Sequence, residues 1–543
     1  MAVAEGRPAE PTGYAARIMA VLAADPDRPA VHWRGRAVTA GEFARSVAGA
    51  IRALRALGAG PGSVVGCLVA PNSPDMLTAR YAAHLLGAAV CYLRSTNPGS
   101  TTPVLSVDAQ LRVLRDTSAD VLFTDAENAG RAQALAERAG GGLRVTGFGV
   151  AGTGAVQATP AETPDLEAPG PWDPRALAVI SFTSGTTGRP KGIRVSIRAW
   201  DSVVSATAAS VTEADPRILV TTPLSHTAGP MADAVLAAGG TVFLHEEFEP
   251  AKALRAVAEH HITRTFMATP HLYLATDRAR AHPADLSSLR QLIYSGCAAA
   301  PARIAEAATV FGPVLVQGYG TTEGGRIALL DPGEHLDPHL RSTVGRPFPE
   351  VEVKVCDPQS GEELAAGVAG EVWVRSPHVM DGYLGDPELT ARVLHDGWYL
   401  TGDIGSLDER GYLHLVDRVA DMVKTGGVKV YPAVVEREIA ALPGIAHVAV
   451  YGVRDADNIE HVHAAIVPRP GARISPDTVR SHIGATLSAT HAPEEIRFLA
   501  ELPLNDSGKP DKRRLRLLGS TGQGPRTIPL APVPSDASKA QRP

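Results

Sequence analysis

The sequence predicts an α/β fold. We expect a large N-terminal domain of stacked α/β layers with a small β subdomain, and then a small, mobile α+β C-terminal domain. Three observations predict it. The chain has 543 residues, which is more than one hydrophobic core usually supports. Apolar runs typical of buried strands alternate with segments of helical periodicity. After about Gly345 the apolar period changes to two, which is typical of antiparallel strands.

The first elements follow from periodicity. Apolar residues recur at helical spacing from Phe43 to Leu57, and Gly58 marks the end of that helix. The run SVVGCLVA (63–70) predicts a buried strand, and a helix is expected over 76–86. Strands alternating with helices predict parallel sheets that are covered on both faces. The same alternation recurs later, as the strands RILVTTP (217–223), GTVFLHE (240–246) and TRTFMATP (263–270) and the helix PAKALRAVAEHH (250–261).

The remaining segments set the domain limits. Residues 149–174 are rich in Gly, Ala, Thr and Pro, and predict a surface connection. Val351, Val353 and Val355 alternate with charged residues and indicate the β subdomain. The runs KVYPAVVEREIAALPG, HVAVYGV and HVHAAIV then predict a compact α+β unit. We expect domains at 1–417 (β subdomain 345–417) and 418–518, and a disordered tail at 519–543, which lacks periodicity.

Composition excludes several classes of function. A net charge of −6 argues against a nucleic-acid partner or a polybasic membrane anchor. The first residues lack the basic and apolar regions of a signal peptide, and no apolar run is long enough to span a membrane. We therefore expect a cytoplasmic protein. The cysteines, which show no zinc-type spacing and fit a reducing compartment, are Cys67, Cys91, Cys297 and Cys356.

A polar, glycine-rich loop follows the apolar run of residues 176–180. Residues 181–193 read SFTSGTTGRPKGI, which combines hydroxyl groups, glycines and a single lysine. Glycines let the backbone approach a ligand closely, and consecutive N–H groups with an ammonium suit phosphate oxygens. The spacing differs from the GxxxxGK[ST] of a Walker A loop. The loop therefore predicts phosphate binding of another type.

The arrangement [ST]SGTTGxPKG resembles the phosphate loop of adenylate-forming enzymes, a superfamily that includes acyl-CoA synthetases, nonribosomal adenylation domains and luciferases. Further segments agree with this family in order and approximate spacing, over roughly residues 15–516. They are PLSHTAG (223–229), QGYGTTEGG (317–325), DGWYLTGDIGSLDERGYLHLVDR (396–418) and PLNDSGKPDKRRL (503–515).

The resemblance implies an ATP-dependent ligase that joins a carboxylate to AMP and releases pyrophosphate. It implies catalytic roles for Lys509, Thr322, Glu323 and Lys191, with Glu323 as the Mg²⁺ ligand. Tyr319 would stack on adenine, and Asp403, helped by Arg418, would accept hydrogen bonds from the ribose hydroxyls. The full set of implied ATP- and AMP-binding residues is Thr183, Ser184, Gly185, Thr186, Thr187, Gly188, Gly296, Cys297, Ala298, Gly318, Tyr319, Gly320, Thr321, Asp403 and Arg418.

The acid substrate is less well defined by the sequence. Candidates for its pocket are His226, Met267, Tyr294, Ser295 and Arg326, with Ser225 and His271 as further candidates. A charged side chain such as Arg326 would be costly to desolvate beside a long alkyl chain, so a compact or aromatic small-molecule acid is expected.

The acceptor is also open. The family passes its acyl group to coenzyme A or to the phosphopantetheine of a carrier protein after the C-terminal domain rotates. The hinge residue is usually Asp or Lys, but here it is Ala420. One alternative is transfer to a nitrogen acceptor, including nitrite activation for diazotisation of an arylamine in natural-product biosynthesis. A second is a non-catalytic adenylate-binding homologue, which the retained charged residues disfavour.

Overall fold

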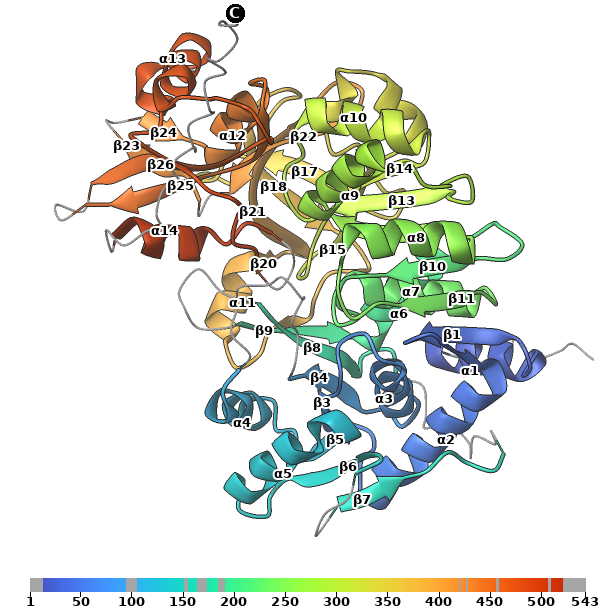
Figure 1. Ribbon diagram of the computed structural model, residues 1–543. Helices are drawn as coiled ribbons and strands as arrows, with labels where there is room; N and C mark the ends of the chain where they lie inside the picture. Colours follow the sequence, from blue (N-terminus) through green and yellow to red (C-terminus); the bar gives the residue numbers. More distant parts are fainter. Residues whose placement is uncertain are drawn as a thin grey trace, which may run out of the picture. The chain divides into compact units, whose positions relative to one another are not determined.

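The computed structural model describes residues 13–93, 105–150, 155–163, 173–183, 191–418, 421–425, 428–455, 459–505 and 509–520. The chain forms two compact units. The first contains the residues up to Asp421 together with the segment Leu504–Pro510, and the second contains Met422–Pro503 and the residues from Asp511 onward. Both units mix helices and sheets, which confirms the predicted fold class (Figure 1).

A nine-stranded sheet forms one layer of the first unit. Its central strands are parallel, and antiparallel strands complete both edges. In spatial order the strands are β16 (Arg346–Pro347), β15 (Gly325–Leu330), β14 (Leu315–Thr321), β13 (Gln291–Ser295), β12 (Arg264–Ala268), β10 (Arg217–Val220), β11 (Thr241–Leu244), β1 (Pro29–Trp33) and β2 (Arg36–Thr39).

An eight-stranded sheet forms a second layer of the same unit. The strands, in spatial order, are β19 (Gly382–Tyr383), β9 (Lys191–Ser196), β8 (Leu177–Thr183), β4 (Ala89–Tyr92), β3 (Val64–Leu68), β5 (Val121–Asp125), β6 (Arg144–Phe148) and β7 (Ala155–Ala158). Strand β7 corrects the expectation for residues 149–174, because part of that segment pairs in parallel with β6. The segment AVQA contains one β-branched residue, Val156, which favours a strand.

Helices fill the space between the sheets and cover their outer faces. The largest buried cluster joins side chains of both sheets to five helices, namely α1 (Tyr14–Ala24), α2 (Ala40–Ala56), α3 (Pro74–Leu85), α6 (Ile197–Ala208) and α7 (Ala228–Ala237). A second cluster lies under α8 (Pro250–His260), α9 (Thr269–Ala281) and α10 (Pro301–Phe311), and a third under α4 (Val107–Asp116) and α5 (Ala129–Arg138).

The predicted helix over residues 43–57 is α2, and its ends follow from local chemistry. Thr39 Oγ1 accepts a hydrogen bond from the Glu42 N–H at 3.2 Å, and the Glu42 carboxylate accepts one from the Thr39 N–H at 3.0 Å. This capping box satisfies N–H groups that the first turn leaves unpaired. Gly58 follows the helix with φ +77°, a conformation that favours glycine.

The β subdomain is a five-stranded antiparallel sheet. It comprises β17 (Glu352–Cys356), β18 (Gly370–Arg375), β20 (Leu394–His395), β21 (Trp398–Leu407) and β22 (Leu413–Arg418), with α11 (Pro387–Val393) beside it. Short 3₁₀ helices in this unit span Ala126–Asn128, Pro332–Leu336 and Leu340–Ser342.

The second unit is a small α+β structure. Its elements are β23 (Val423–Thr425), β24 (Val428–Val430), α12 (Pro432–Ala440), β25 (Ile445–Arg454), β26 (Glu460–Pro468), α13 (Pro476–Thr486), a 3₁₀ helix (Ala489–His491), β27 (Glu495–Phe498) and α14 (Lys512–Ser520). Helix α14 therefore extends two residues into the predicted tail, and residues 521–543 lie outside the described part of the chain.

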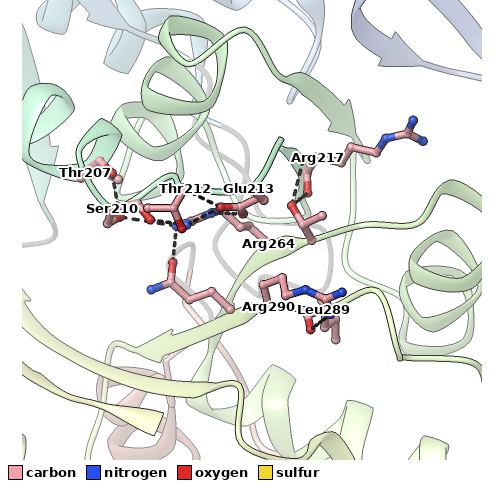
Figure 2. A network of polar contacts seen from close by, with 10 residues as sticks. Thr207, Ser210, Thr212, Glu213, Arg217, Arg264, Leu289 and Arg290 are labelled. Carbon is pink, nitrogen blue, oxygen red and sulfur yellow. Dashed lines mark hydrogen bonds and ion pairs between the residues drawn. The ribbon is translucent and has the colours of Figure 1, made fainter. Parts of the chain in front are cut away.

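Two buried arginines hold loops of the first unit. The Arg264 guanidinium binds both carboxylate oxygens of Glu213, at 2.5 and 2.9 Å, and donates to Gln291 at 2.6 Å, which anchors the connection from α6 to β10 (Figure 2). Arg80 pairs with Asp233 at 2.5 Å, and neither side chain is exposed. Arg80 also donates to the Leu224 carbonyl at 3.2 Å.

None of the helices in the described residues combines the length and apolar character needed to cross a membrane.

Candidate active site

The segment QGYGTTEGG forms the end of β14 and the turn into β15. Thr321 Oγ1 accepts a hydrogen bond from the Gly324 N–H at 2.7 Å, which closes the turn around Thr322 and Glu323. Gly320 is required there, because a Cβ would lie 2.3 Å from the Gly325 carbonyl oxygen. The turn therefore presents Glu323 at the carboxyl end of a strand, where α/β sheets commonly bind ligands.

Three strands bring a carboxylate, a phenol and a guanidinium together. Asp403 on β21 lies opposite Arg418 on β22 in the antiparallel ladder, and Arg418 Nε donates to Asp403 Oδ1 at 2.9 Å. Tyr319 donates its hydroxyl proton to Asp403 Oδ2 at 2.5 Å. The Asp403 side chain is 9% exposed. Attraction to Asp403 raises the pKa of Arg418. The carboxylate is thus fixed in orientation and can accept further hydrogen bonds from a polyol.

Glu323 and Lys191 meet at a second tyrosine. Tyr383 on β19 donates its hydroxyl proton to Glu323 Oε1 at 3.0 Å. Lys191, the first residue of β9, holds its ammonium 5.5 Å from the centroid of the Tyr383 ring. Burial beside the Glu323 charge raises the pKa of Tyr383, so its hydroxyl stays protonated and continues to donate.

Lys509 completes this set of charges. It lies in the segment Leu504–Pro510, which groups with the first unit. Its N–H donates to Asn505 Oδ1 at 3.0 Å, and a Cβ placed on Gly296 would lie 3.4 Å from its Cε. Burial and the nearby Arg418 charge lower the pKa of Lys509. Burial and Lys509 also lower the pKa of His226 to about 4, so this imidazole is neutral at pH 7.

Residues 19–384 match the protein-family model described as AMP-binding enzyme, and residues 434–509 match the model of its C-terminal domain. The chain belongs to the AMP-binding enzyme family. It is an ATP-dependent, AMP-forming ligase with an α/β fold.

Individual members of the AMP-binding family are similar over almost the whole chain. A feruloyl-CoA synthase of an Amycolatopsis species is 37% identical over 499 residues, covering 90% of this chain and 96% of its own. A medium/long-chain-fatty-acid–CoA ligase of Mycobacterium tuberculosis is 32% identical and covers 95% of this chain and 91% of its own. The solved amide bond synthetase McbA of Marinactinospora thermotolerans is 36% identical, with a TM-score of 0.83 over 93% of this chain and 99% of its own.

The structure places most of the implied AMP-binding residues around the groups described above. Gly296, with φ +107°, Cys297 and Ala298 follow β13, where Thr269 donates its hydroxyl proton to the Cys297 carbonyl at 3.1 Å. Thr183 ends β8 directly opposite Lys191. The implied phosphate-loop residues Ser184, Gly185, Thr186, Thr187 and Gly188, and the hinge residue Ala420, lie outside the described part of the chain.

The five candidates for the acid pocket do not share one face of the sheet. Met267 and Tyr294 are register partners on β12 and β13, and both are buried in the cluster under α9 and α10. The Tyr294 hydroxyl bonds to Gln317 and His335, each at 3.0 Å. Ser295, the next residue, points to the opposite face because side chains alternate along a strand. A single cavity facing one side of the sheet cannot be lined by all of them.

The sequence suggested that Arg326 carries an unpaired charge, but the structure gives this charge two partners. Its Nε lies 3.3 Å from Glu350 Oε1, and its guanidinium lies 3.6 Å from the centroid of the Phe348 ring. Glu350 also contacts His378 Nε2 at 3.1 Å. The cost of placing hydrocarbon near Arg326 is smaller than the sequence suggested, because the charge already has a partner.

Sequence reasoning missed Tyr383 and the residues that hold PLSHTAG. Asn72 accepts from the Leu224 N–H at 2.9 Å and donates to the Thr222 carbonyl at 3.0 Å, and Arg80 binds the Leu224 carbonyl. These side chains fix the turn that carries His226. The only sequence feature pointing to Tyr383 was its place in DGYLGDP, a glycine-flanked aromatic residue that is typical of many turns.

Proposed function

We propose that this ligase adenylates a small aromatic carboxylic acid and transfers the acyl group to coenzyme A. The observation that carries the proposal is the clustering of six polar side chains. Asp403 on β21 bonds both Tyr319 of β14 and Arg418 of β22. Glu323 and Lys191 share contacts with Tyr383, and the charge of Lys509 interacts with those of Arg418, Asp403 and Glu323. In the first step a carboxylate oxygen attacks the α-phosphorus of ATP, and the bond to the bridging oxygen breaks to release pyrophosphate. In the second step the coenzyme A thiolate attacks the acyl carbon, and AMP leaves.

The nucleotide roles follow from the contacts. Asp403 would accept hydrogen bonds from the two ribose hydroxyls, because Arg418 and Tyr319 already fix its orientation. Thr321 and Thr322 would lie along the α-phosphate. Lys509 would bridge the attacking carboxylate and the α-phosphate, where its charge offsets the negative charge of the transition state. The neutral His226 would border the acyl group.

Glu323 is the residue proposed to hold Mg²⁺. Within the described ranges no three His, Cys, Asp or Glu side chains are arranged to hold a metal by themselves. Mg²⁺ in nucleotide sites usually binds one or two carboxylates together with phosphate oxygens and water. One carboxylate whose Oε1 is oriented by Tyr383 fits a metal that arrives with the triphosphate. Bound there, the metal would neutralise phosphate charge.

An aromatic acid is proposed because the feruloyl-CoA synthase is 37% identical and covers nearly the whole chain. The fatty-acid–CoA ligase, at 32% identity, makes a medium- or long-chain fatty acid the alternative substrate class.

A second candidate changes the acceptor. The amide bond synthetase similarity, at 36% identity and a TM-score of 0.83, favours transfer from the same adenylate to an amine nitrogen. A carrier-protein phosphopantetheine offers the same thiol chemistry as coenzyme A and is a further acceptor of this proposal.

A screen that separates the two half-reactions tests these proposals. Pyrophosphate release would be measured with ferulate, benzoate or palmitate, and products would be identified by mass spectrometry with coenzyme A, with an arylamine, or with neither. We expect ferulate-dependent pyrophosphate release and a thioester that requires coenzyme A. An amide formed in preference to the thioester would establish the second candidate. Preferred turnover of palmitate would contradict the aromatic substrate.

A further inference from the structure

Residues 380–384 connect the strand that carries Lys191 to the turn that carries Glu323. The Met380 N–H donates to the Glu323 carbonyl at 2.7 Å. The Asp381 N–H donates to the Arg194 carbonyl at 2.8 Å, and the Leu384 N–H to the Gly192 carbonyl at 2.7 Å. The same short segment therefore bonds to β9 and to the backbone of Glu323.

Local sequence makes this close approach feasible. A Cβ on Gly192 would lie 3.0 Å from Leu384 Cβ, so the glycine that follows Lys191 leaves room for the segment. Gly382 has φ +131°, and a Cβ there would lie 2.6 Å from Thr390 Cγ2. Thr390 Oγ1 in turn accepts from the Tyr383 N–H at 2.9 Å. The backbone of Tyr383 is thus fixed on both sides.

The side chain of Tyr383 contacts both charged groups at once. Its hydroxyl bonds Glu323 Oε1 at 3.0 Å, and its ring lies 5.5 Å from the Lys191 ammonium. Hydrogen bonds to a carboxylate are stronger than those between neutral groups and restrict its orientation. A ring face attracts a cation through its quadrupole. The residue is 8% exposed, so water competes weakly for either contact.

We propose that Tyr383 is a positioning residue for adenylation, which holds Glu323 through its hydroxyl and Lys191 through its ring. This inference rests on the proposed function, in which Glu323 holds Mg²⁺ at the triphosphate. It also takes Lys191, which lies beside the predicted phosphate loop, to contact the β- and γ-phosphates. The two contacts use different parts of the side chain, so two substitutions separate them. Tyr383→Phe removes the hydrogen bond and keeps the ring, whereas Tyr383→Leu removes both.

Tyr412 provides a matched control within the same unit. Its hydroxyl donates to Glu334 Oε1 at 2.7 Å, the Arg346 guanidinium lies 4.7 Å from its ring centroid, and it is 7% exposed. It precedes β22 at the opposite end of the β21–β22 hairpin from Asp403 and Arg418. Tyr412→Phe and Tyr412→Leu therefore make equivalent changes away from the site.

The experiment measures turnover, nucleotide affinity and melting temperature for all four variants. For Tyr383→Phe we expect about tenfold slower pyrophosphate release, and ATP binding in EDTA, followed by calorimetry, within twofold of the parent. For Tyr383→Leu we expect ATP binding in EDTA to weaken about tenfold as well, with AMP affinity within twofold, because Lys191 is assigned to the outer phosphates. The Tyr412 variants should match the parent in all nucleotide assays.

The outcomes distinguish this inference from the proposed function. Equal effects of the Tyr383 and Tyr412 variants, or parental turnover of Tyr383→Phe, would overturn the role of Tyr383. Lys191→Ala, measured in parallel, tests the assumption beneath it. If Lys191→Ala keeps full ATP affinity, the proposed role of Lys191 is wrong. If it loses affinity and Tyr383→Leu does not, the inference about Tyr383 alone is wrong.

Discussion

Single side chains in this ligase have their charge state set by the contacts around them. Lys509 is the group whose removal should affect chemistry most and folding least. Its charge interacts with those of Arg418, Asp403 and Glu323. The His84 imidazole is the opposite case, because both ring nitrogens are bonded inside the protein.

Lys509→Ala should reduce pyrophosphate release by about two to three orders of magnitude, as expected when one electrostatic stabiliser of the transition state is lost. The melting temperature should stay within about 1 °C, which for a chain of this length corresponds to about 1 kcal/mol. Lys252→Ala is a suitable control, since that lysine is 58% exposed and lies in α8. Unchanged pyrophosphate release in Lys509→Ala would contradict its role.

His84 should make stability depend on pH. Tyr14 donates to its Nδ1, and its Nε2–H donates to the Ala178 carbonyl, each at 2.8 Å. Burial lowers the pKa of His84 to about 3. Between about pH 6.5 and 3 the unfolded chain binds a proton that the folded chain does not, so stability falls as pH falls, by up to about 1.4 kcal/mol per pH unit. The free energy of unfolding would be measured in urea at several pH values from 7 to 5. For His84→Gln, the change of this free energy with pH should correspond to about one fewer proton bound on unfolding than in the parent. An identical slope would show that His84 is protonated in the folded state.

Loops and strands are fixed by a few polar side chains as well as by apolar packing. The connection from α6 to β10 is held by Arg264, which binds Glu213, Gln291 and the Ser210 carbonyl (Figure 2). The side chains of Arg264 and Glu213 are only 7% and 14% exposed. Removing one partner would leave a buried charge unpaired, which is costly.

Arg264→Met should lower the free energy of unfolding by about 3 kcal/mol and leave the kcat of adenylation near the parental value. Arg290→Met, at an exposed neighbour that binds the Ser287 carbonyl at 2.7 Å, should change stability by less than about 0.5 kcal/mol. Chemical unfolding of both variants, with pyrophosphate release measured alongside, checks this. Equal destabilisation by the two substitutions would show that the Glu213 pair contributes nothing specific.

At the scale of the whole molecule, the sequence predicted the layers of the fold better than the contacts of individual side chains. The alternation of strands and helices predicted the layers. The motifs singled out charged residues that the structure brings close to one another, and their roles toward a nucleotide stay predictions. Strand β7 was missed because four residues, AVQA, carry too little periodicity to distinguish them from a loop. Met267 and Tyr294 were named as pocket candidates without knowledge of which face of the sheet each side chain takes. Tyr383 was missed because its partners are distant in sequence.

The two half-reactions should respond differently to a change at Ala420, which lies outside the described residues. Ala420→Pro fixes φ near −65° and should reduce thioester formation at least tenfold more than pyrophosphate release, if the C-terminal unit must rotate between steps. Both products would be followed in the same sample. Equal loss of both would indicate misfolding or no hinge at this position, and an unimpaired final product would favour an acceptor that needs no rotation.

Strand β19 has a consequence for how the protein is made. Gly382 and Tyr383 pair with Arg194 and Ile193 of β9, so the edge of the eight-stranded sheet is covered by residues translated much later. At about 5–20 residues per second, a ribosome needs roughly 10–40 s to add the intervening stretch. During that interval β9 presents unpaired backbone groups, which invite association with other nascent chains. Messages truncated before residue 380 should therefore yield aggregates, and slow codons placed just after β9 should increase the demand for chaperones.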